Sequence, residues 1–282
     1  MSPTWRSDAP LPPGPALGPR DWMRILRRGV PLAVVTFGGL AVLLAIRLVE
    51  RPLFGLARPV TPHVTQFVCR AAFVLMGIRR EVRGTPMQGQ GAVVANHASW
   101  LDIFALNAGQ RVYFVSKSEV AGWPGIGWLA RSTGTLFIDR DRRAAAEQSR
   151  LFADRLAAGH LLLFFPEGTS TDGRRVLPFK TTLFQPFLQE GLRARLSIQP
   201  VTVAYAAPPG ADPRHYGWWG DMDFGGHLLK VLATPRQGSV TLTYHPPVPI
   251  GAHPDRKALA RRLEEEVRAG LGASRRGATQ AD

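Results

Sequence analysis

The sequence predicts an α/β fold: a mixed, largely parallel sheet flanked by helices and preceded by an N-terminal hydrophobic helical membrane segment. Two observations predict it. Beyond residue 80, short apolar runs of strand length alternate with longer helical stretches, which is typical of parallel sheets covered by helices. Before that point, an uncharged apolar run is flanked by arginines. With 282 residues, 45% of them hydrophobic, the chain can bury one substantial core.

The chain divides into four predicted segments. Residues 1–20 repeat Pro and Gly, and residues 272–282 offer almost no side chain to bury, so both ends are expected to be disordered. Residues 21–80 are expected to form membrane-anchoring helices, and residues 81–271 to form the folded domain.

The membrane segment is predicted from Val30–Ile46, a run of seventeen residues without a charge. A helix crosses a bilayer with about 20 apolar residues, and about 17 suffice. A second stretch, Val64–Ile78, contains Gln66 and Arg70, so it is expected to lie in the membrane interface or to pack on the first helix. Alternatively, both stretches are core helices of a soluble domain. More arginines precede the first run than follow it, which favours the cytoplasm for its N-terminal side.

The remaining elements follow from apolar runs bounded by turn residues. Strands are predicted at Ala92–Ala95, Val112–Ser116, Thr135–Ile138, Leu161–Phe165, Ile198–Ala204 and Val240–Tyr244. Helices are predicted at Trp100–Ala108, Gly125–Thr133, Arg142–Ala158, Thr181–Gly191 and Asp255–Leu271. In folds of this class, reactive groups collect where strands end. Polar clusters do follow three of these strands, beginning at Asn96, Asp139 and Pro166.

The charge balance limits the classes of partner. Lys and Arg number 35 against 21 Asp and Glu, and the formal net charge of +14 favours an anionic partner. The arginines crowd around apolar runs instead of forming a basic stripe interleaved with aromatic residues, so no nucleic acid is expected. The one cysteine, Cys69, permits no internal disulfide and fits a reducing compartment.

The candidate catalytic pair is His97 and Asp102, in the segment NHASWLD. Five positions apart, these side chains would point about 140° apart on one continuous helix. They can meet only if His97 lies in the loop before a helix and Asp102 in its first turn, with Ser99 as the N-cap. Asp102 would then orient the imidazole and leave its second nitrogen as a base. Alternatively, Asp102 only completes a capping box and His97 is an ordinary loop residue.

Three further motifs follow this segment in order. They are Phe114–Arg140, then FPEGTS with VLPFK just downstream, then IQPVTVAY. Together, over roughly residues 90–250, the four blocks resemble the glycerolipid acyltransferases, the 1-acylglycerol-3-phosphate acyltransferase family. The resemblance implies that residues 81–271 are an acyltransferase catalytic domain. It also implies a bacterial-type inner membrane, with this domain facing the cytoplasm.

Carried over residue by residue, the resemblance implies that His97 is the general base and Asp102 its orienting partner. The hydroxyl of a lyso-lipid would attack an acyl thioester directly, and no Gly-x-Ser-x-Gly nucleophile motif occurs. The substrate-binding candidates are Lys117, Arg140, Glu167, Gly168 and Thr169. Lys117 and the backbone amides after Pro166 could donate to the thioester oxyanion, and the resemblance places an acceptor-binding arginine at Arg140. Alternatively, Lys117 and Arg140 are solvated surface residues. No cofactor and no metal are implied.

One position departs from the family pattern. Members that accept lysophosphatidic acid often read FPEGTR, whereas Ser170 stands here in place of the arginine. Arg174 or Arg175 could supply the missing charge. Alternatively, the acceptor is no phosphate monoester, because the stretch TSTDGRRVLPFKTTLF resembles the branch that acylates lyso-ornithine lipid. Both acceptors, 1-acyl-sn-glycerol-3-phosphate and lyso-ornithine lipid, stay open, as do acyl-ACP and acyl-CoA as donors. Membrane lipids are the other expected partners.

Two rival functions also stay open. A metal-dependent lipid hydrolase could use His97, Asp102 and Glu167 as ligands, although no His-x3-His pair occurs. A non-catalytic basic membrane-binding protein would need none of these residues. The aromatic and glycine-rich segment His215–Leu229 has no assigned chemistry and is expected to be a membrane-facing or lid loop, or to pack in the core.

Overall fold

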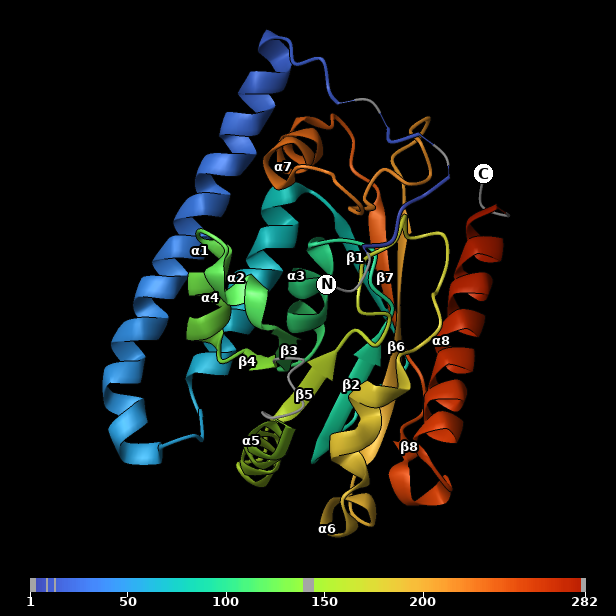
Figure 1. Cartoon of the computed structure of the whole chain (residues 1–282). Coiled ribbons are helices and arrows are strands. Elements are labelled where there is room, and N and C mark those ends of the chain that lie inside the picture. Colours follow the sequence, from blue (N-terminus) through green and yellow to red (C-terminus); the bar gives the residue numbers. More distant parts are fainter. Residues whose placement is uncertain (1–3, 9, 13, 139–144, 280–282) are drawn as a thin grey trace.

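The central feature of the molecule is one β-sheet between two groups of helices (Figure 1). The computed structural model describes residues 4–8, 10–12, 14–138 and 145–279. The sheet in these residues has eight strands: β1 (Arg79–Arg83), β2 (Gly91–Ala95), β3 (Tyr113–Lys117), β4 (Leu136–Ile138), β5 (Leu161–Phe164), β6 (Ser197–Ala206), β7 (Ser239–Tyr244) and β8 (Val248–Pro249). The predicted α/β class is confirmed.

The sheet is mixed and largely parallel, as predicted. Its strand order is β1-β7-β6-β2-β5-β3-β4, with β8 paired to β6 off this path. Strands β7 and β8 run antiparallel to β6, and the other pairs are parallel. Every residue of the central strand β2 is buried, because Val93 and Ala95 face one core while Ala92 and Val94 face the other. The carboxyl ends of β2, β5, β6 and β3 therefore meet at one edge.

Helices cover both faces of the sheet. One core packs α1 (Pro19–Phe54), α2 (Thr61–Met76), α3 (Leu101–Gly109) and α7 (Phe224–Ala233) against it. The other core packs α5 (Ala145–Ala157), the 3-10 helix η3 (Thr181–Leu188) and α8 (Arg256–Thr279). Two shorter helices, α4 (Ile126–Thr133) and α6 (Glu190–Arg193), lie at the periphery.

Helix α1 lies on the outside of the molecule (Figure 1). Within the described ranges it is the helix that is long and apolar enough to cross a membrane, and only 6% of its most apolar 18-residue window is buried. A core helix of a soluble domain would be covered, so this exposure favours association with a membrane. Helix α2 packs against α1, which was one of the two arrangements expected for the second apolar stretch.

Two side chains tie α1 to the rest of the protein. The Arg28 guanidinium donates to the backbone oxygens of Leu232 at 2.9 Å and Thr234 at 2.5 Å, which end α7. Near the other end of α1, Glu50 accepts from the backbone N–H and the hydroxyl of Thr61, at the start of α2. The apolar helix is thus fixed at both ends.

Several boundaries differ from the sequence prediction. Helix α8 continues to Thr279, so residues 272–279 are helical where a disordered tail is predicted; their alanines and arginines are good helix formers. Near the N-terminus, Trp5 packs on Trp219 with ring centroids 6.2 Å apart, which gives that end a side chain to bury. The helix predicted at Thr181–Gly191 is a 3-10 helix to Leu188, with Pro186 inside it.

Candidate active site

The two candidate catalytic side chains meet at the carboxyl edge of the sheet. Strand β2 ends at Ala95, a short loop carries His97, and α3 begins at Leu101 with Asp102 in its first turn. His97 Nδ1 lies 2.8 Å from Asp102 Oδ2. The carboxylate is fully buried, whereas 20% of the imidazole side chain is exposed. The predicted pairing across a loop-to-helix junction is confirmed, and Nε2 is left as the second ring nitrogen.

Asp102 orients the imidazole and holds the loop at the same time. Its Oδ2 also accepts the backbone N–H groups of Ala98 at 2.7 Å and Ser99 at 3.0 Å. Its Oδ1 accepts the hydroxyl of Tyr205, at the end of β6, at 2.7 Å. Burial and the neighbouring carboxylate raise the pKa of Tyr205 well above its usual value, so the phenol stays a donor. The two alternatives drawn from the sequence, orienting partner and capping carboxylate, therefore coexist.

The helix start differs by one residue from the prediction. Trp100 occupies the N-cap position with helical backbone angles, and the expected cap Ser99 offers only a 3.4 Å contact from its Oγ to the N–H of Leu101. The first hydrogen bond runs from the Asp102 N–H to the Ser99 carbonyl at 3.1 Å, so the first turn is tight. The capping carboxylate is Asp102, because it accepts from the loop upstream.

His97 is held by a stacked ring on one face of its imidazole and by hydrogen bonds to its backbone. The ring of Phe165, which follows β5, stacks on His97 with centroids 4.0 Å apart and an angle of 11° between the planes. The His97 N–H donates to Glu167 Oε1 at 2.7 Å, and its carbonyl accepts the N–H of Thr171 at 2.9 Å. The FPEGTS segment thus positions the loop that carries His97, a role that its sequence alone did not reveal.

Glu167 is placed as a positioning group. Its side chain is 1% exposed, and its second oxygen accepts the N–H of Leu177 at 2.7 Å, so each oxygen binds one backbone amide. Burial raises the pKa of Glu167 to about 8, although the two amides oppose this shift. The side chain therefore holds the backbone of the His97 loop and of Leu177. Within the described residues, no group of three or more His, Cys, Asp or Glu is arranged to hold a metal ion.

Of the other predicted substrate-binding residues, Gly168, Thr169 and Lys117 lie within the described residues and Arg140 does not. Gly168 has a φ of +71°, and a Cβ built on it would lie 2.5 Å from Lys180 Nζ, so any other residue would be strained and would have to displace the lysine side chain. Thr169 Oγ1 accepts the N–H of Trp5 at 3.2 Å. Lys117 ends β3 at the same edge of the sheet and is half-buried. Arg140 falls outside the residues that the structure describes.

The aromatic segment His215–Leu229 supports the catalytic loop. The Trp218 N–H donates to the Ala98 carbonyl at 2.8 Å, next to His97. Tyr216 and Trp219 are buried, which confirms core packing for this part. The segment then enters α7, whose N-cap Asp223 accepts the N–H of Gly226; a loop was expected there, because two glycines weaken the helix signal.

A row of aromatic rings leads away from the catalytic loop. Trp100 packs on Phe104 and on Phe224, with centroids 6.0 and 5.5 Å apart. Phe224 packs on Trp218, which in turn packs on Trp123, each pair at 6.3 Å. Trp123 at the far end is 42% exposed. The row forms an apolar wall between the loop and the surface.

Comparison with known proteins shows that the chain is similar to acyltransferases. The family model described as Acyltransferase matches residues 79–204. A "Lyso-ornithine lipid O-acyltransferase" of Rhodobacter capsulatus is 56% identical over 271 residues, covering 96% of this chain and 98% of the relative. A protein of the same name from Brucella abortus is 39% identical over 73% of this chain and 81% of the relative.

Some of the more distant relatives carry a different name. A "1-acyl-sn-glycerol-3-phosphate acyltransferase" of Neisseria gonorrhoeae is 30% identical over 71% of this chain and 77% of its own length. The crystal structure of the 1-acyl-sn-glycerophosphate acyltransferase from Thermotoga maritima superposes with a TM-score of 0.57 at 21% identity, covering 88% of this chain and 98% of that one. At that identity the superposition supports the fold alone.

Proposed function

The chain belongs to the acyltransferase family, and from this premise we propose that it transfers a fatty acyl group from a thioester donor to the free hydroxyl of a lyso-ornithine lipid. Two observations support the proposal. The 2.8 Å contact between His97 and Asp102 provides a base for the hydroxyl. The relative that is 56% identical over nearly the whole chain carries the name of this activity, whereas the relative from Neisseria gonorrhoeae named for the glycerophosphate acceptor is 30% identical over 71% of the chain.

The first step is removal of the hydroxyl proton. Nδ1–H of His97 donates to the Asp102 carboxylate, which keeps Nε2 unprotonated and able to accept the acceptor's proton. The acceptor oxygen forms a bond to the thioester carbonyl carbon as its proton moves to Nε2. The imidazolium that results is stabilised by the buried carboxylate of Asp102.

The second step is collapse of the tetrahedral intermediate. Its oxyanion needs donors close by, and the candidates are Lys117 and the backbone N–H groups that follow Pro166. The C–S bond then breaks, and the leaving thiolate takes the proton from the imidazolium, so that the ester and the free thiol leave and His97 is neutral again. No acyl-enzyme forms. Whether the thiol belongs to acyl-ACP or to acyl-CoA stays open, and the charge of +14 would attract either anionic donor.

The surroundings of the pair suit a lipid substrate. The aromatic row from Trp100 to the exposed Trp123 offers an apolar path for an acyl chain toward the surface. Helix α1 supplies membrane contact. We place the enzyme at a bacterial-type inner membrane with the catalytic domain facing the cytoplasm, because the thioester donors are cytoplasmic. Both ends of α1 bind the folded domain, through Arg28 and Glu50, so in this proposal α1 contacts the membrane without carrying the domain across it.

A purified-enzyme assay tests the function. The full chain in lipid vesicles receives one acyl donor and either lyso-ornithine lipid or lysophosphatidic acid. We expect turnover of lyso-ornithine lipid and a loss of at least about 100-fold in His97→Ala, since general-base catalysis typically contributes that much. His63→Ala removes an exposed histidine of α2 and serves as the matched control. Turnover of lysophosphatidic acid alone would refute the acceptor, and an active His97→Ala would refute the mechanism.

A further inference from the structure

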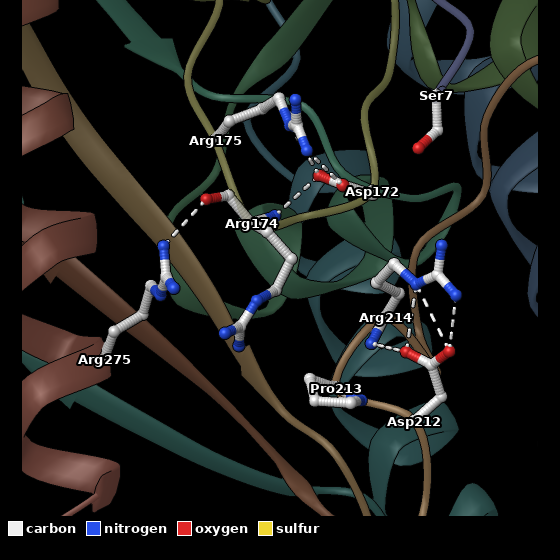
Figure 2. A pocket seen from close by; sticks show the side chains of 8 residues that line it. All are labelled: Ser7, Asp172, Arg174, Arg175, Asp212, Pro213, Arg214 and Arg275. Carbon is white, nitrogen blue, oxygen red and sulfur yellow. Dashed lines mark hydrogen bonds and ion pairs between the residues drawn. The ribbon is translucent and has the colours of Figure 1, made fainter. Parts of the chain in front are cut away.

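A cavity lined by charges of both signs opens beside the FPEGTS segment (Figure 2). It has a volume of about 440 Å3. Its charged lining residues are Asp172, Arg174, Arg175, Asp212, Arg214 and Arg275. The excess of arginine over aspartate makes the cavity cationic, yet it keeps two carboxylates.

Most of these charges are already paired with one another. Asp172 binds Arg175 at 3.0 Å and is 2% exposed, and Asp212 binds Arg214 at 2.7 Å. The Asp212 side chain remains 35% exposed, so its carboxylate is accessible from the cavity.

Arg174 differs from the other arginines. Among the described residues, its guanidinium has no hydrogen-bond or ion-pair partner; only its backbone N–H, which donates to Asp172, and its carbonyl, which accepts from Arg275, are engaged. Figure 2 shows its side chain extending into the space between Arg275 and Asp212. A half-buried guanidinium with its donors unused is suited to bind an anion.

The wall of this cavity is continuous with the catalytic loop. Asp172 follows Thr171, whose N–H binds the carbonyl of His97 at 2.9 Å. Gly173, between Asp172 and Arg174, is so close to that loop that a Cβ built on it would lie 3.4 Å from the Ala98 Cβ. The cavity wall therefore packs directly against the His97 loop.

We propose that this cavity binds the zwitterionic head group of the acceptor, with Arg174 binding its carboxylate and Asp212 its terminal ammonium. The assignment rests on the proposed function, because an N-acylated ornithine carries these two charges. A phosphate monoester is less well matched, because it carries no cationic group that could bind the carboxylate of Asp212. In this chain, where Ser170 stands in place of the family arginine, the cavity thus determines which acceptor head group binds.

Acceptor analogues and variants together test the assignment. The acceptors are lyso-ornithine lipid, its carboxylate methyl ester and its terminal N-acetyl derivative. We expect Arg174→Ala to raise KM for the parent acceptor by about 10-fold or more, the usual contribution of a charge-assisted hydrogen bond, and to leave KM for the methyl ester unchanged. Asp212→Asn should discriminate in the same way between the parent and the N-acetyl acceptor. Arg276→Ala removes an exposed, neighbouring charge outside the cavity as the matched control.

The outcomes separate this proposal from the function itself. Equal increases of KM for the parent and the methyl ester in Arg174→Ala, or an increase in the donor KM instead, would overturn the head-group assignment. Arg174→Lys should recover part of the loss, and thermal unfolding of each variant identifies a folding defect. Wild-type enzyme that acylates lysophosphatidic acid but not lyso-ornithine lipid would refute the acceptor, whatever the variants do. Normal acylation of lyso-ornithine lipid by Arg174→Ala refutes only the cavity.

Discussion

The substitution Asp102→Asn separates the electrostatic role of the carboxylate from its structural one. In the structure, Oδ2 accepts from three groups, His97 Nδ1 and the N–H groups of Ala98 and Ser99, while Oδ1 accepts from the Tyr205 hydroxyl. An asparagine is expected to place its carbonyl oxygen at the Oδ2 position, because an amide NH2 there would face two N–H donors. Its NH2 would then face the phenol oxygen, which can accept as well as donate.

The expected loss follows from this geometry. With the carbonyl in place, Nδ1–H still donates and Nε2 remains the base, so the tautomer is preserved. Only the charge is lost, and a charge-assisted hydrogen bond contributes about 1.5–3 kcal/mol. At about 1.4 kcal/mol per factor of ten, kcat/KM should fall roughly 10- to 100-fold. In Ser-His-Asp enzymes, where the same change leaves the wrong tautomer, the loss is about 10⁴-fold.

Steady-state acyl transfer at saturating donor measures the effect, with thermal unfolding as the control for folding. Asp102→Ala should instead destabilise the protein, because it leaves two buried N–H groups and a phenol without an acceptor, at about 1–3 kcal/mol for each buried group. A loss near 10⁴-fold in Asp102→Asn would show that the amide is flipped and the tautomer wrong. Unchanged kcat/KM would refute the catalytic role of the carboxylate.

Three further predictions concern the groups around the pair. Burial raises the pKa of Glu167 to about 8, so the contribution of this side chain to the free energy of unfolding is fully present below its unfolded pKa near 4.5 and is lost as pH rises toward 8. In urea unfolding, the stability advantage of wild type over Glu167→Gln should therefore be smaller at pH 8 than at pH 5.5. A difference that does not change with pH would contradict the raised pKa. Gly168→Ala should destabilise the protein by about 1 kcal/mol or more and lower its activity, because φ is +71° and the new Cβ would meet Lys180. The control Gly191→Ala, with open space around it, should leave Tm and activity nearly unchanged. Equal effects of the two substitutions would refute the conformational argument. Tyr205→Phe removes one hydrogen bond to the catalytic carboxylate and should lower kcat severalfold while KM stays the same, so a rise in KM alone would point to substrate binding instead.

Sequence patterns predict the interior of the fold better than its edges. The central strands are continuous apolar runs, because helices cover both faces, and a run such as that at Gly91–Ala95 is recognisable without context. Strand β1 reads RREVR and lies at the sheet edge. Four of its five side chains are charged, so the alternation of apolar and polar residues that marks a strand is absent. Strand β8 has two residues and offers no pattern at all.

The site is predictable in part for a related reason. His97 and Asp102 lie within one short segment, so local geometry is enough to pair them. The hydroxyl of Tyr205 reaches the same carboxylate from 103 positions away, which needs the register of β6 on β2. Substrate binding is predicted for Glu167 from its place in the FPEGTS segment, and this stays a prediction. Its contacts with the backbone N–H groups of His97 and Leu177 could not be predicted, because a sequence does not show which carboxylate will bind backbone amides. The stacking of Phe165 on the imidazole is likewise a tertiary contact.

The contact between Arg28 and the end of α7 has a practical consequence for anyone who shortens this chain. The guanidinium caps the backbone oxygens of Leu232 and Thr234, and the segment that leads into α7 holds Ala98 through the Trp218 N–H. A protein from which the apolar helix α1 has been removed to make it water-soluble would lose the Arg28 contact and would expose the face of α2 that packs on α1. Trimming would therefore loosen the scaffold behind the reactive imidazole, and preparations that keep the entire chain in detergent or nanodiscs are the material on which kinetic work should be done.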